Sequence, residues 1–190
     1  MKTDVWLKKA LPTKGNPHPT LPSTPFILQG KRAASNGTVL YVAIDTPTES
    51  DMPLTRHEDK MIELLTRPLP SSAEVTTDPL LHAAKAAKAV AADALRLTLG
   101  GSVLVYAKGP DASTSWELTD GSRWEPGKAG KSTTIHCSRS GPNAEVALSP
   151  KLLYSALSGM GEMITVEVGA NLVRIGDGNR IAVIAAMHMP

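Results

Sequence analysis

Aromatic residues are scarce in this chain of 190 residues, where they make up 4% and include a single Phe. A buried core must therefore be built from Val, Ile, Leu, Ala and Met. Hydrophobic residues make up 42% of the chain, which excludes a disordered protein. The formal net charge is only +2. This balance excludes a histone-like polycation but permits a local basic patch, because the surface potential depends on where charges lie and not on their sum.

Reactive and metal-binding residues are also few. Cys137 is the only cysteine, which excludes an internal disulfide and a zinc site built from several thiolates, and we expect it to act as a small hydrophobic residue. The histidines show no metal-ligand spacing and lie apart in the sequence, at positions 18, 57, 82, 136 and 188. No acid and base stand out as a catalytic pair. We therefore expect a protein that is not an enzyme and that uses no metal or cofactor.

Long hydrophobic runs are absent as well. The chain has no stretch of about eighteen apolar residues, which excludes a membrane-spanning helix of the usual kind. Its first residues, 1–12, form a segment too short and too charged for a secretory signal. These absences predict a soluble, cytoplasmic protein with no membrane partner.

What the chain does contain is an internal repeat. Ser72–Leu81 and Asn143–Leu153 each combine a short extended segment with a helix start, at Asp78-Pro79 and at Ser149-Pro150. An Asp or Ser side chain can accept a hydrogen bond from a free backbone N–H there, and proline is well tolerated at the first helical position. Apolar residues then follow at helical spacing, Leu80, Ala84, Ala87, Ala91 and Leu95 in the first copy and Leu152, Leu153, Ala156, Leu157 and Met160 in the second.

Each helix is followed by alternating runs around a glycine-containing turn, at 95–109 and 164–178, which predict β-hairpins. A third strand is expected at Ser132–Cys137 in the first copy and at Arg180–Met189 in the second. The repeated unit is therefore strand, helix and three strands. We predict that 72–142 and 143–190 are two such units, packed together as one domain over 72–190.

The N-terminal third contains a fainter copy of the same unit. Phe26–Gly30 and Gly37–Asp45 predict a hairpin with a longer loop, and Val5–Leu11 predicts a short helix before it. His57–Leu65 fits either a short helix or a strand, so the structure of 46–71 is left open. We interpret 1–71 as a partial unit whose apolar face would need a neighbouring subunit as its partner.

These patterns resemble those of the DNA polymerase sliding clamps, in particular the bacterial β-clamp type. Ala147–Leu157 is similar to the family's helix start F-N-x-K-Y-L-x-D-A-L. His18–Ser23 followed by Gly37–Asp45 is similar to R-P-x-L…G-x-L-x-L-x-A-T-D, and Ile181–Pro190 to the closing strand V-x-M-P-M-R-L. The resemblance implies an α+β, clamp-like fold of repeated β-α-β-β-β half-units, with the helices on one face of antiparallel sheets.

The resemblance also implies a function. A clamp acts as a polymerase processivity factor: it encircles duplex DNA without reading its sequence and docks the polymerase and the clamp loader through short peptide motifs. Family rings contain twelve half-units, so three half-units per chain predict a homo-oligomer of four chains. The alternative is a clamp-like protein-interaction module that does not encircle DNA. A third possibility is a two-layer α+β domain with a merely convergent pattern.

Two groups of residues are the candidates for these roles. The DNA-binding candidates are basic residues on the expected helices, Lys8, Lys9, His82, Lys85, Lys88 and Lys151, although amphipathic helices carry such residues as ordinary solvated surface too. The partner-binding candidates are the positions that match the family's closing strand, Ala185, Met187, His188, Met189 and Pro190. Methionine suits a hydrophobic docking cleft because its side chain is flexible and polarisable, although a strand end can also carry it incidentally.

Overall fold

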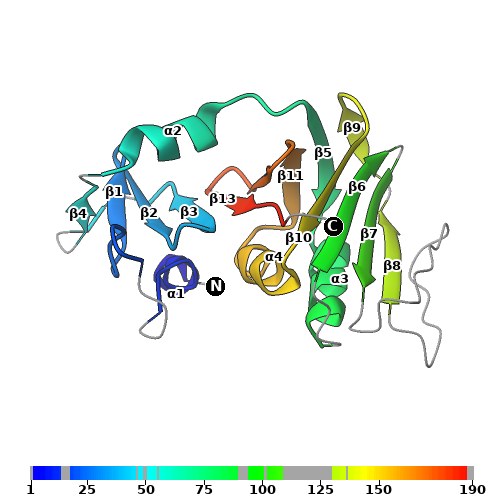
Figure 1. Cartoon of the computed structure of the whole chain (residues 1–190), viewed down its shortest axis with the longest axis horizontal. Coiled ribbons are helices and arrows are strands. Elements are labelled where there is room, and N and C mark those ends of the chain that lie inside the picture. Colours follow the sequence, from blue (N-terminus) through cyan, green and yellow to red (C-terminus); the bar gives the residue numbers. More distant parts are fainter. Residues whose placement is uncertain are drawn as a thin grey trace.

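The structure, a computed structural model, describes residues 2–13, 18–45, 47–48, 51–54, 56–89, 94–100, 102–108, 130–135 and 137–187. Within these residues the chain forms a nine-stranded sheet, a four-stranded sheet and four helices (Figure 1). None of these helices is long and apolar enough to cross a membrane.

Both of the repeated units that the sequence predicts are present. The first consists of β5 (Ser71–Thr76), α3 (Thr77–Ala89), β6 (Ala94–Gly100), β7 (Ser102–Lys108) and β8 (Gly130–Ile135). The second consists of β10 (Ala144–Leu148), α4 (Pro150–Leu157), β11 (Met163–Val168), β12 (Leu172–Gly176) and β13 (Arg180–Ala185). Ser149 is the N-cap of α4, as expected, but its side chain makes none of the capping hydrogen bonds that the sequence suggested. Helix α3 begins one residue before Asp78, which therefore lies in the first helical turn.

The two units exchange their first strands. The strand before each helix pairs with the three-stranded meander of the other unit, so β5 lies beside β11 and β10 lies beside β6. The smaller sheet has the order β10-β6-β7-β8, and the short β9 (Ser138–Ser140) extends the larger sheet beyond β5. Neither unit can complete its sheet without the other.

The N-terminal unit differs from the prediction in one element. It contains α1 (Thr3–Lys8), β1 (Phe26–Leu28), β3 (Val39–Ala43) and the short β4 (Met52–Pro53), as well as β2 (Lys31–Ser35) where a loop was expected. A strand that starts Lys31-Arg32 looks solvent-exposed, yet Arg32 is only 7% exposed. Its Nε donates to Asp51 Oδ2 at 2.7 Å and its Nη1 to Asp4 Oδ1 at 2.6 Å, which explains how the charge is tolerated.

The N-terminal unit has a partner within its own chain. β3 pairs with β13, with Leu40 opposite Val183 and Val42 opposite Ile181, and this joins the unit to a sheet of order β4-β1-β2-β3-β13-β12-β11-β5-β9. The expectation that this unit needs a neighbouring subunit to cover it is therefore wrong. The predicted boundary between the segments 1–71 and 72–190 remains a proposal, because the nine-stranded sheet contains strands from both segments.

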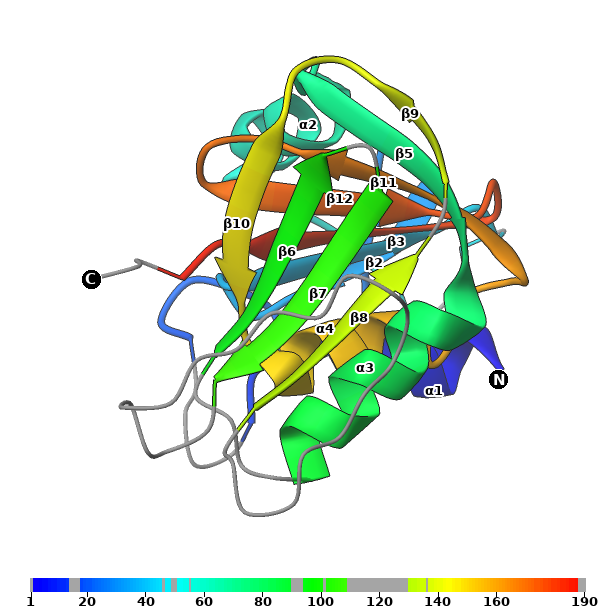
Figure 2. The ribbon, with the colours of Figure 1, turned by 90° about the vertical axis from the view of Figure 1, so that its right-hand side faces the viewer.

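The helices lie in two places. α1, α3 and α4 lie side by side on one face of the sheets (Figures 1 and 2), and their buried residues share one core with Val166 and Ile175. The fold class that the sequence predicts is thus confirmed. The ambiguous segment is helix α2 (Glu58–Thr66), which lies on the opposite face and packs through Met61 in a second core with Phe26 and Leu40.

Trp6 fastens α1 to the rest of the molecule. Its ring stacks on Tyr41 of β3 with centroids 4.4 Å apart, and its Nε1 donates to the carbonyl oxygen of Ala156 in α4 at 2.9 Å. The ring also lies against Gly159, where an added Cβ would be 2.2 Å from Trp6 Cδ1. The N-terminal helix is therefore held against the last helix by one fully buried side chain.

Candidate nucleic-acid face and peptide pocket

The basic residues that the sequence singles out lie on the three helices of one layer. All are exposed: Lys8 and Lys9 at the end of α1, His82, Lys85 and Lys88 on α3, and Lys151 at the start of α4. These exposed cationic side chains lie on the helical layer, on the face of the molecule opposite to α2. Such a surface can contact phosphates without reading bases.

The structure brings two of these residues together. Lys9 Nζ donates to Ser158 Oγ at 2.7 Å, and Lys88 Nζ lies 4.8 Å from the centre of the Tyr154 ring, so both amines are held beside α4. Partial burial and, to a smaller extent, the positive charge of Lys88 lower the pKa of Lys9. Two ammonium groups that repel each other form a favourable position for an anion such as a phosphate.

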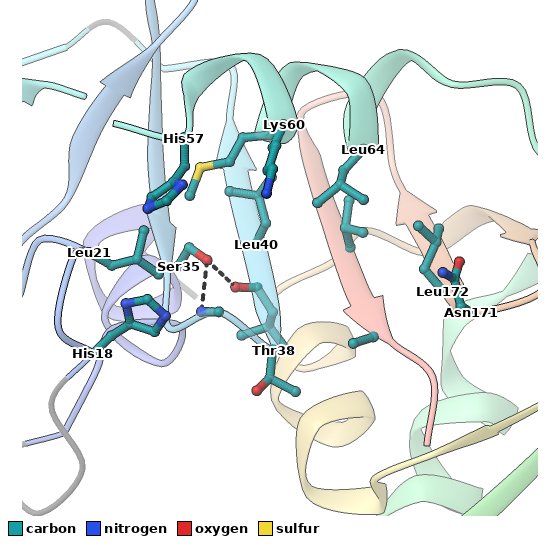
Figure 3. Close-up of a pocket in the computed structure, with 15 residues that line it drawn as sticks. His18, Leu21, Ser35, Thr38, Leu40, His57, Lys60, Leu64, Asn171 and Leu172 are labelled. Atoms are coloured by element: carbon teal, nitrogen blue, oxygen red, sulfur yellow. Dashed lines mark hydrogen bonds between the residues drawn. The ribbon is translucent and has the colours of Figure 1, made fainter. Parts of the chain in front are cut away.

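A cavity of about 460 Å³ lies on the opposite face, under α2 (Figure 3). Its floor comes from neighbouring strands, because Leu40 of β3 pairs with Val183 of β13, and Ala185 of β13 pairs with Leu172 of β12. Residues two apart on a strand face the same side of a sheet. Helix α2 forms the wall with Lys60, Met61 and Leu64, which lie on one helical face.

The rim of the cavity is formed by the tight turn between β2 and β3 and by the loop that contains His18. Ser35 Oγ donates to the carbonyl oxygen of Val39 at 2.7 Å and accepts from the Gly37 amide at 3.2 Å. Gly37 has φ +90°, and an added Cβ would lie 2.9 Å from His18 Cδ2, so glycine allows the loop to close on the turn. Thr20 links that loop to α2 by a hydrogen bond of 2.9 Å between its Oγ1 and His57 Nε2.

Several solved structures share this architecture. A DNA polymerase sliding clamp from Bacillus subtilis matches 98% of this chain over 62% of its own length, with a TM-score of 0.70 and 13% identity. The DNA polymerase III beta chain from Streptococcus pneumoniae matches the same shares with a TM-score of 0.67 and 12% identity. The chain has the fold of a bacterial sliding clamp.

The beta subunit of a Streptococcus pyogenes DNA polymerase is a further match, with a TM-score of 0.62 and 12% identity, covering 87% of this chain and 57% of that one. The chain thus spans less than two thirds of the length of these clamps. No family model matches the sequence, and no curated protein does. At such low identity the likeness establishes the clamp fold, and the sequence-based resemblance to this family is confirmed at that level.

The predicted partner-binding residues do not all lie at the cavity. Ala185 lines the cavity. Met187 is 39% exposed, but its backbone turns to the other sheet, where its N–H donates to the carbonyl oxygen of Ala147 at 2.8 Å. His188, Met189 and Pro190 lie outside the described residues. Helix α2 was not identified from the sequence as a wall of this cavity. The spacing of Lys60, Met61 and Leu64 is nevertheless that of residues on one face of a helix.

The α2 wall is fixed to the sheet by Arg174 of β12. Its Nη1 donates to the carbonyl oxygens of Leu65 at 2.6 Å and Arg67 at 3.1 Å, at the C-terminal end of α2. Its Nε donates to Glu167 Oε2 at 2.6 Å. The last carbonyls of a helix have no partner within the helix, so this guanidinium satisfies groups that would otherwise stay unpaired and holds α2 over the cavity.

Among the described residues, no three His, Cys, Asp or Glu side chains lie close enough to hold a metal ion. Cys137 is half-buried against the main core, which agrees with the structural role expected for it. The candidate site is therefore a pair of surfaces, a basic helical face and an apolar pocket on the other side of the sheet.

Proposed function

We propose that this chain is a subunit of a DNA sliding clamp, a processivity factor that holds replication proteins on duplex DNA. The observation that carries the proposal is the clamp fold with three helices on one face, all bearing exposed basic residues. The helical face would contact backbone phosphates and read no bases. Binding of this kind is independent of sequence and weakens with salt, and it allows a protein to slide.

In this proposal the chain acts without catalysis, metal or cofactor, in the cytoplasm. Its three units cannot surround a duplex alone, so we propose that copies associate into a ring, with four chains as the number that twelve half-units require. The cavity beside Ala185 would dock the polymerase and the clamp loader through short peptides. Its apolar floor and volume suit one or two large apolar side chains.

A second candidate is a clamp-like module that binds protein partners and never encircles DNA. It is favoured by the fact that the pocket is complete within a single chain, whereas a ring needs association. The two candidates differ in assembly and in the topology of DNA binding.

Two measurements separate them. Light scattering after size exclusion gives the assembly mass, and we expect a multiple of the 20.0 kDa subunit. The protein should also remain on nicked circular DNA after a salt wash and slide off the same DNA once it is linearised. A monomer that is washed equally from circular and linear DNA would reject the ring and leave the interaction module.

A further inference from the structure

The turn between β2 and β3 contains an asparagine followed by a glycine. Asn36 precedes Gly37, and it is the only asparagine of the chain that a glycine follows. The backbone nitrogen of a glycine can approach the side-chain amide of the residue before it, because no Cβ stands in the way. Gly37 and Thr38 are exposed, so water reaches this turn.

Two backbone donors hold the side-chain amide of Asn36. Its Oδ1 accepts from the Thr38 N–H at 2.9 Å and from the Val39 N–H at 3.1 Å. A nucleophile that attacks Cγ would place negative charge on this oxygen, and donors that already point at it stabilise that charge. The turn thus presents Asn36 as an oxyanion hole presents a carbonyl group.

The backbone nitrogen of Gly37 also has a partner. Its N–H donates to Ser35 Oγ at 3.2 Å, and the Ser35 hydroxyl donates in turn to the carbonyl oxygen of Val39 at 2.7 Å (Figure 3). Ser35 is only 3% exposed, so the strand holds its hydroxyl in this orientation. The hydroxyl oxygen is therefore placed to accept the proton that the nitrogen loses when it attacks.

We propose that Asn36 is a modification site, at which the turn promotes deamidation of its own side chain. The Gly37 nitrogen forms a bond to Asn36 Cγ, and its proton leaves through Ser35 Oγ to water. The Cγ–Nδ2 bond breaks, and the amide nitrogen takes a proton from water and leaves as ammonia. Water then opens the cyclic imide, at Cγ to give aspartate or at the backbone carbonyl carbon to give isoaspartate. No electrons are transferred, and water is the only co-reactant.

Deamidation changes the contact between this turn and the last strand. The carbonyl oxygen of Thr38 accepts from the N–H of Ala185 in β13 at 2.9 Å. Isoaspartate passes the main chain through the side-chain carbons of position 36, which lengthens the turn and displaces Thr38. Aspartate keeps the backbone but adds a negative charge. The modification therefore loosens one end of the pairing between β3 and β13 as the protein ages.

A second turn of the molecule offers a matched comparison. Between β12 and β13, Asp177 Oδ1 accepts from the backbone N–H groups two and three residues further on, at 2.9 and 2.8 Å. Gly178 has φ +87°, close to the +90° of Gly37. The residue before Asp177 is Gly176, which has no hydroxyl to take the place of Ser35. Asp177→Asn therefore gives an Asn-Gly turn with the same donors and without the hydroxyl.

The test is to incubate the folded protein at mildly alkaline pH and to follow position 36 by mass spectrometry of the tryptic peptide 33–56. Asn36 is the only asparagine in that peptide. The reference is the isolated peptide under the same conditions. We expect deamidation to be about ten-fold faster in the folded protein, which is modest for acid–base assistance because a hydroxyl is a weak base.

Ser35→Ala should lower the rate at position 36 to that of the isolated peptide, with circular dichroism to show that the variant is folded. Asp177→Asn should deamidate at position 177 several-fold more slowly than at position 36 of the same sample. This second variant leaves Ser35 in place, so the comparison holds even if Ser35→Ala does not fold.

Three results would overturn the proposal. A folded protein that deamidates no faster than the isolated peptide would show that the hydrogen bonds of the turn protect Asn36. An unchanged rate in folded Ser35→Ala would show that the hydroxyl takes no part. Equal rates at positions 36 and 177 of Asp177→Asn would mean that the turn geometry alone sets the rate.

Discussion

At the scale of single residues, Tyr41 combines full burial with an unused polar group. Its ring is 0% exposed and stacks on Trp6, while its hydroxyl has no hydrogen-bond partner among the described residues. Burial also raises the pKa of this hydroxyl. A buried hydroxyl without a partner costs stability, because it has lost its hydrogen bonds to water.

Tyr41→Phe should therefore raise the free energy of unfolding by about 1 kcal/mol, because it keeps the stacked ring and removes the unpaired hydroxyl. Urea unfolding measures the change. Tyr154→Phe is the control, since Tyr154 is half-buried, and its effect should stay within about 0.5 kcal/mol. A loss of stability in Tyr41→Phe would show that the hydroxyl is satisfied after all.

The buried ion pair of Arg32 and Asp51 makes stability depend on pH. Burial alone would raise the pKa of Asp51, but hydrogen bonds from Arg32 and Thr48 outweigh it, and the pKa is lowered overall. The carboxylate therefore stabilises the fold fully above its unfolded pKa of about 4, and this contribution is lost as the pH falls through the lower, folded pKa.

Asp51→Asn should cost about 2 kcal/mol at pH 7, because Arg32 keeps only Asp4 as a charged partner. The variant should also lose less of its stability than the unchanged protein between pH 5 and pH 3, which unfolding curves at several pH values would detect. The exposed Asp45, replaced by Asn, serves as the control. Parallel pH profiles for Asp51→Asn and the unchanged protein would contradict this account.

At the scale of elements, the contact between α1 and α4 depends on a missing side chain. Gly159→Ala would place a Cβ 2.2 Å from Trp6 Cδ1, and Trp6 cannot move aside because Tyr41 and the Ala156 carbonyl hold it. We expect a loss of about 2–3 kcal/mol in the free energy of unfolding. Near-ultraviolet circular dichroism should report the displaced indole.

Gly161→Ala is the matched control two residues further on. An added Cβ there would be 3.5 Å from Asp177 Oδ2, which is an ordinary contact, so stability should change by less than about 0.5 kcal/mol. Equal effects at the two glycines would mean that loss of glycine itself, and not the approach of Trp6, is what matters.

A helix or strand could be predicted from the sequence when the residues that it contacts lie close to it in the sequence, and could not when they lie far away. The hairpins β6–β7 and β11–β12 follow from alternating residues around a short turn, and their positions are confirmed. β2 was missed because Arg32 is neutralised by Asp4 and Asp51, which lie far from it in the sequence. The cavity could not be predicted because its lining comes from segments that only the pairing of β3 with β13 brings together.

At the scale of the whole molecule, the helical layer is the part that the proposed ring would turn toward DNA. Lys85→Glu combined with Lys88→Glu should weaken binding to duplex DNA of any sequence. Each lost phosphate contact should also lower the slope of log affinity against log salt by about 1. Fluorescence anisotropy over a salt series measures both quantities.

Lys31→Glu with Lys60→Glu is the matched control, because it changes the net charge equally while Lys31 lies on β2 and Lys60 lies on α2, away from the helical layer. It should weaken binding far less. If both double variants reduce affinity and salt slope to the same extent, the helical layer is not the DNA-binding face and binding follows net charge alone.

The exchange of strands between the two complete units has a consequence for how the chain is made. During synthesis β5 leaves the ribosome well before its partner β11, because the remainder of the first repeated unit and the start of the second lie between them in the sequence. Until then β5 and the helix that follows it have an apolar face and open backbone groups. Pairing over such sequence separations is slow, so β5 is exposed to aggregation while the segment between the two strands is synthesised. A chaperone that shields β5 would therefore matter more to its yield than to its final stability.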